Sequence, residues 1–124
     1  MNKLIIQSVV IAACLTGAGL AQAANMAFMM DQAMSRFNEQ DAQFFNEASA
    51  KALAAKDGTP VRWSNPASGA FGTLTPYPDP QKNPACREIH MENVAENVKS
   101  AGYYRFCKRS DGSWQPVMSS QNKR

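Results

Sequence analysis

The stretch that decides the fold is CREIHMENVAENVKSAGYYRFCKRSDGSW, residues 86–114. β-forming side chains lie on both sides of Glu96-Asn97, and Asn readily adopts the positive φ that a tight hairpin turn needs. If the turn is centred between these two residues, facing residues have numbers that sum to 193. Cys86 then faces Cys107, at a separation that allows a cross-strand disulfide.

The same register sorts the hairpin side chains onto two faces, because successive strand residues point to opposite sides. One face carries Ile89, Met91, Tyr104 and Phe106. The other carries Cys86, Glu88, His90, Tyr103, Arg105 and Cys107. On this second face Glu88 lies opposite Arg105, which pairs opposite charges across the strands. A slip by one residue, or a longer turn, would exchange the two faces.

The chain begins with the features of an export signal. Lys3 precedes an apolar run from Leu4 to Leu20, and Ala21-Gln22-Ala23 fits a small-x-small cleavage site. We therefore expect residues 1–23 to be a signal peptide that is removed from the mature protein. Two alternatives stay open: a membrane-spanning helix, for which the run is short, and a lipoprotein signal in which Cys14 becomes lipidated.

The cysteines agree with export to an oxidising compartment. Cys14 falls within the signal, which leaves Cys86 and Cys107 as an even pair. A disulfide between them would close a loop of about 20 residues and stabilise the fold by about 3 kcal/mol. A metal site built from these two cysteines and His90 lacks a fourth ligand and a C-x-x-C spacing, so we expect no metal and no other cofactor.

Residues 24–57 are predicted to form one amphipathic helix. Apolar side chains recur there at helical steps, no Pro or Gly interrupts the segment, and Gly58 follows where a helix would end. The simpler interpretation is that the apolar stripe packs on the β-rich part. The other is an adaptable, sulfur-rich surface for a protein partner or lipid, formed by Met26, Met29, Met30 and Met34. Contact with a protein partner would also use Phe37, Phe44 and Phe45.

Residues 58–118 are predicted to form a small antiparallel sheet of about four to five strands. Alternating side chains flank the turn-forming segment Asn65-Pro66-Ala67-Ser68-Gly69. Four prolines within residues 76–84 exclude a central strand there. Residues 114–118 are expected to be an edge strand, and residues 119–124 a frayed tail. Together with the helix, this predicts an α+β fold with one disulfide.

Five segments in this half of the chain resemble, in order and spacing, the C-terminal domain of the 17 kDa surface antigen family of Gram-negative envelopes. They are Val61–Gly69, Gly72–Pro76, Cys86–Glu88, Cys107 and Asp111–Trp114. The resemblance implies a small β-domain, an envelope location, a Cys86–Cys107 disulfide and no enzyme activity. Members of that family usually carry a lipidated cysteine and a glycine-zipper segment, at the place where this chain has the predicted helix.

Charge is divided unevenly along the chain. The formal charge is −2 over residues 24–57 and +4 over residues 58–124, which favours docking of the helix on the β-rich part. Lys108 and Arg109, with the basic tail, could bind anionic lipid or lipopolysaccharide phosphates, although a solvated face is the simpler interpretation. Aromatic residues are too sparse among the cations to suggest nucleic acid as a partner.

No set of nucleophile, base and oxyanion donors stands out in the sequence, so we expect that the protein is not an enzyme.

The first predicted function is that of an exported envelope protein with a structural or protein-interaction role, in the periplasm or at the outer membrane. It would contact an unidentified envelope protein through the helix or an open sheet edge. The alternative is a lipid- or glycan-binding module that uses the side of Trp63, Tyr103 and Arg105. The candidate interaction residues are Phe37, Phe44, Phe45, Trp63, Arg87, Arg105, Lys108 and Arg109. Oligomeric state is not predicted.

Overall fold

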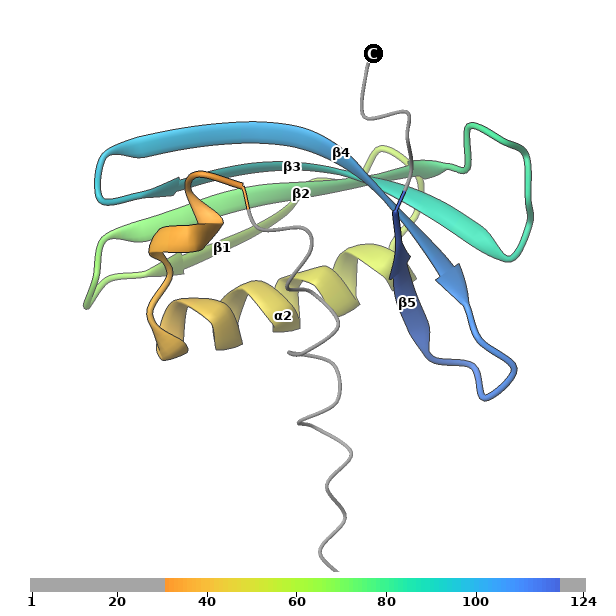
Figure 1. Ribbon diagram of the computed structural model, residues 1–124, viewed down its shortest axis with the longest axis horizontal. Helices are drawn as coiled ribbons and strands as arrows, with labels where there is room; N and C mark the ends of the chain where they lie inside the picture. Colours follow the sequence, from red (N-terminus) through yellow and green to blue (C-terminus); the bar gives the residue numbers. More distant parts are fainter. Residues whose placement is uncertain (1–30, 119–124) are drawn as a thin grey trace, which may run out of the picture.

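The computed structural model describes residues 31–118. A five-stranded antiparallel sheet, with its strands in sequence order, has one α-helix packed against one of its faces (Figure 1). The elements are η2 (Met34–Arg36), α2 (Glu39–Ala54), β1 (Val61–Asn65), β2 (Ala70–Pro78), β3 (Cys86–Ala95), β4 (Val98–Lys108) and β5 (Trp114–Val117). The predicted α+β fold with one disulfide is therefore confirmed. The predictions for residues 1–23, for Cys14 and for the tail lie outside the described residues.

The β3–β4 hairpin has the predicted register. Cys86 lies opposite Cys107, and the two are joined by a disulfide. The turn residues Glu96 and Asn97 have φ values of 50° and 65°. Positive φ at both central residues is the geometry of a two-residue turn whose twist matches that of the flanking strands. The predicted division of side chains between the two faces follows from this register.

The single helix predicted for residues 24–57 is too long, because the described part of that segment is broken at Phe37-Asn38. Asn38 is extended, with φ −81° and ψ 178°. Its side chain accepts a hydrogen bond from the backbone N–H of Asp41 at 2.8 Å, and the Asp41 carboxylate accepts one from the backbone N–H of Asn38 at 3.0 Å. This capping box starts α2 at Glu39. A separate 3₁₀ turn, η2, precedes the break.

Replacing the N-cap residue should weaken α2 measurably. We expect Asn38→Ala to lower the free energy of unfolding by about 1 kcal/mol, because the Asp41 N–H loses its acceptor. Urea unfolding followed by circular dichroism measures the change. Gln43→Ala is the matched control, since Gln43 is exposed in the middle of the same helix and Ala is the better helix former. Equal losses in the two variants would show that the capping box does not set the helix start.

The hydrophobic core lies between α2 and the sheet. Leu74, Ile89 and Met91 are completely buried there, and α2 packs against β1 and β2. Phe45 is 4% exposed, and the Phe37 and Phe44 side chains are partly buried against the same core. The apolar stripe of the helix therefore packs on the β-unit. The alternative, in which the helix phenylalanines form a free surface for a partner, does not fit this packing.

Candidate interaction site

A pocket opens between α2 and the free edge of β1. It has a volume of about 180 Å³ and is lined by Phe44, Glu47, Ala48 and Lys51 from the helix and by Arg62, Trp63 and Ser64 from the strand. The helix residues are spaced three, four and seven apart, so they belong to one helix face. The strand residues are consecutive, so the pocket runs along the strand edge rather than over one sheet face.

The charged side chains of this pocket are not used elsewhere in the described fold. None of the ion pairs found within residues 31–118 involves Glu47, Lys51 or Arg62. Two cations and one carboxylate leave the lining with a formal charge of +1. The pocket is therefore a polar, net-positive hollow beside an indole and a phenyl ring.

Arg87, a candidate interaction residue, instead closes the C-terminal end of α2. Its guanidinium donates to the carbonyl oxygens of Ala52, Leu53 and Ala55 at 3.4, 2.7 and 2.7 Å. It also pairs with Asp57 at 2.5 Å. The last carbonyls of a helix have no partner within the helix, and a cation there also complements the helix dipole. Arg87 thus joins β3 to α2 and is not an exposed recognition group.

Arg105 is held in a two-pronged ion pair with Asp79. Its Nε and Nη2 donate to the two carboxylate oxygens of Asp79 at 2.8 and 3.0 Å, and Nη2 lies 3.5 Å from the Cys86 sulfur. The predicted position of Arg105 opposite Glu88 is confirmed. Asp79 follows β2 directly, in the connection to β3. The surface connection predicted for residues 76–84 is wrong for residues 76–78, which extend β2 and pair with β3.

This ion pair makes stability depend on pH in the acid range. The hydrogen bonds from Arg105 hold the pKa of Asp79 below its ordinary value of 3.8, against the opposing effect of burial. The resulting stabilisation is present above that ordinary value and is lost as the pH falls through the lowered pKa of the folded protein.

We expect Asp79→Asn to remove part of this acid dependence. At neutral pH the variant should be less stable by about 2 kcal/mol, because a buried charge-assisted pair loses its charge. Below about pH 4 the difference from the unaltered protein should shrink, since protonation removes the same charge there. Urea unfolding as a function of pH measures both effects. A difference that stays constant down to acid pH would contradict this role of Asp79.

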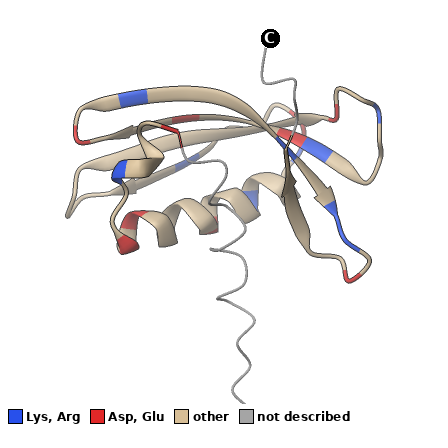
Figure 2. Cartoon of the chain, in the orientation of Figure 1, with Lys and Arg blue, Asp and Glu red and all other residues tan. Residues whose placement is uncertain are grey.

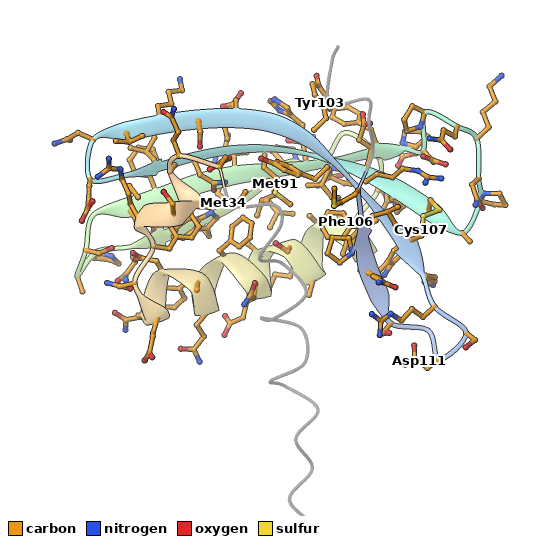
Figure 3. All side chains as sticks on the ribbon, viewed as in Figure 1. Met34, Met91, Tyr103, Phe106, Cys107 and Asp111 are labelled. Atoms are coloured by element: carbon orange, nitrogen blue, oxygen red, sulfur yellow. A yellow bond between two sulfur atoms is a disulfide. The ribbon has the colours of Figure 1, made fainter. Side chains whose placement is uncertain are left out.

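The sequence predicted that Trp63, Tyr103 and Arg105 form one lipid- or glycan-binding surface. This prediction is wrong, because Trp63 lies on the opposite face of the sheet from the other two residues. Trp63 is 6% exposed on the helix side, where its Nε1 donates to Asn93 Oδ1 at 3.1 Å. Tyr103 lies on the other side, where its ring is tilted against that of His90 with the ring centroids 4.6 Å apart. Figure 3 shows Tyr103 on the opposite side of the sheet from Met91 and Phe106. Trp63 is therefore a core residue.

The basic patch predicted near the end of β4 is also engaged locally. The Lys108 ammonium lies 5.2 Å from the centre of the Trp114 ring, and the Arg109 Nε donates to Gln115 Oε1 at 2.8 Å. The other members of the predicted patch lie in the tail, outside the described residues. Within the described part of the chain, Lys and Arg are dispersed over the elements instead of gathered on one of them (Figure 2).

Residues 31–118 contain neither a candidate metal site nor a candidate membrane-spanning helix. Within that range, no three His, Cys, Asp or Glu side chains come together in a way that could hold a metal ion. Over the same residues, no helix is both long enough and apolar enough to cross a membrane.

Comparison with known proteins identifies relatives of one kind. No protein-family profile and no solved structure matches the chain. The 17 kDa surface antigens of Rickettsia bellii, Rickettsia conorii and Rickettsia prowazekii are 36%, 32% and 30% identical to it. Each alignment spans 83 residues, which are 64% of this chain and 52% of the relative. The chain thus spans about half the length of the curated relatives it matches. The resemblance seen in the sequence is therefore confirmed: over these 83 residues the chain is similar to the 17 kDa surface antigens of Rickettsia.

Proposed function

We propose that the protein is an exported, non-catalytic component of a Gram-negative cell envelope, which works in the periplasm or at the outer membrane by contact with another envelope protein. Its relatives are named surface antigens, which supports an envelope location. The Cys86–Cys107 disulfide supports an oxidising compartment, because such bonds persist mainly outside the cytosol.

The observation that carries the contact role is the free edge of β1 with its pocket. Arg87 and Arg105, two of the charged groups expected to face a partner, hold the fold together from within. The pocket cations Lys51 and Arg62 have no ion-pair partner within residues 31–118. A charged pocket along an unpaired strand edge is suited to binding an extended segment of another protein.

Photo-crosslinking in cells tests this proposal. A photoreactive amino acid placed at Ser64, which is exposed on the β1 edge, should give covalent adducts with an envelope protein after irradiation. The control position is Gln115, which is exposed on β5 at the other edge of the sheet. Cell fractionation of the same samples should place the protein in the envelope or periplasm. An unprocessed cytoplasmic chain, or equal adducts from both positions, would contradict the proposal.

The alternative, a lipid- or glycan-binding module, has one observation in its favour. On the sheet face opposite α2, Phe71 is 51% and Tyr77 is 38% exposed. Thermal stabilisation by purified envelope lipid or glycan, lost in Tyr77→Ala, would favour this function over protein contact. Stabilisation that is unchanged in Tyr77→Ala would count against this face as the binding site.

A further inference from the structure

We infer that the β1 edge binds an extended acidic peptide segment by strand addition, with one carboxylate side chain of the segment held in the pocket between β1 and α2. This inference rests on the proposed function and specifies the chemistry of its partner. Three features carry it: the unpaired backbone of β1, the position of the pocket beside that backbone, and the charge of the pocket.

The backbone of β1 is available on one side. β1 stands at the end of the strand order and pairs only with β2, so within the described residues its second edge faces no strand. An edge strand presents a row of N–H and C=O groups that another extended chain can use. β1 contains no proline, whereas β5, the strand at the other edge, is four residues long and includes Pro116. β1 is thus the better template for an added strand.

The pocket lies where alternate side chains of an added strand would point. α2 packs against β1, so an extended segment beside β1 would lie between the strand edge and the helix. In strand addition the backbone hydrogen bonds supply affinity, and pockets for alternate side chains supply specificity. The pocket volume of about 180 Å³ gives room for one side chain of the segment together with water.

The charge of the pocket selects an acidic side chain. Lys51 on the helix and Arg62 on the strand both line the pocket, so its lining offers two cations to a carboxylate of the added segment. Glu47, on the helix wall, balances one of the two cations and leaves one positive charge for the ligand. The same net charge disfavours a dimer in which the β1 edges of two copies pair, because such a dimer would bring two positive pockets together.

Selection of binding peptides tests the inference in vitro. The full chain, as processed and purified from its host, is used to select from a phage-displayed library of short random peptides. We expect enriched peptides to carry one Asp or Glu among β-branched residues, the side chains that favour an extended strand. On adding one such synthetic peptide, amide NMR shifts should be confined to β1 and to the pocket residues of α2.

Two sets of variants separate the side-chain and backbone contributions. Lys51→Gln combined with Arg62→Gln should weaken peptide binding about tenfold, since each exposed pair contributes up to about fivefold. The control Lys56→Gln combined with Lys99→Gln makes the same charge change outside the pocket and should bind normally. N-methylation of alternate peptide residues should abolish binding when it blocks the edge that faces β1, and should be tolerated on the other edge.

Several results would overturn the inference. They are the absence of enriched peptides, enrichment without acidic residues, unchanged binding by the pocket double variant, or NMR shifts that map to β5 or to the face of Tyr77. Shifts of β1 that depend on protein concentration alone would show that a second copy occupies the edge. If crosslinking from Ser64 still yields an envelope protein in cells, the proposed function stands and only the acidic strand-addition mode falls.

Discussion

Removal of the disulfide by Cys86→Ala combined with Cys107→Ala is expected to lower the free energy of unfolding by about 3 kcal/mol. The bond joins residues 21 positions apart and so restricts the unfolded chain over a substantial loop. A small domain buries too little apolar surface for a large stability margin, so this loss should be a large part of the total. Urea unfolding without reductant measures it.

Reductant supplies the control for this prediction. Adding dithiothreitol should destabilise the unaltered protein by a similar amount and leave the double variant unchanged, because only the former contains the bond. The disulfide lies beside the Arg105–Asp79 pair, so the variant should also show whether that pair survives without it. Equal stability of the two proteins without reductant would contradict a stabilising role for the bond.

The second large effect is expected at Gly72 in β2. This glycine lies opposite Trp63 on one side and Asn93 on the other, under the hydrogen bond that joins their side chains. A Cβ atom there would overlap Asn93 Oδ1, Trp63 Nε1 and the backbone oxygen of Glu92. Glycine is therefore required by close approach, not by backbone conformation.

We expect Gly72→Ala to lower the free energy of unfolding by about 3 kcal/mol, the combined result of overpacking and of losing a buried hydrogen bond. Gly102→Ala is the matched control within the same sheet, since the atoms nearest to a Cβ there belong to the Tyr104 side chain, at 3.3 Å or more, instead of to backbone. Urea unfolding followed by tryptophan fluorescence compares the two. Similar losses in both variants would show that the Trp63–Asn93 contact does not determine the effect.

The parts of the fold that were predictable from the sequence are those fixed by local chemistry. The β3–β4 hairpin followed from its turn residues and the cysteine pair, which together define one register. The start of α2 was missed although its signal is present, because Asn38 and Asp41 have the spacing of a capping box. The absence of Pro and Gly from residues 24–57 favours one continuous helix, and this stronger pattern hides the break at Asn38.

The parts that could not be predicted depend on contacts between distant segments. The face on which Trp63 lies is set by two successive pairings, β1 with β2 and β2 with β3, and an error of one residue in either would reverse it. The roles of Arg87 and Arg105 depend on where a helix end and a proline-rich loop come to lie in space. For these residues the sequence showed only charge, which is equally typical of a recognition surface.

The central claim is that this is an exported, disulfide-stabilised envelope domain, and the intact mass of the protein tests it most directly. The protein is purified from its native envelope without reductant. We predict a mass that begins at Ala24 and is two hydrogens below that of the reduced chain. A mass beginning at a triacylated Cys14 would agree with export but would show a membrane-anchored protein. A full-length chain with free thiols would contradict the claim.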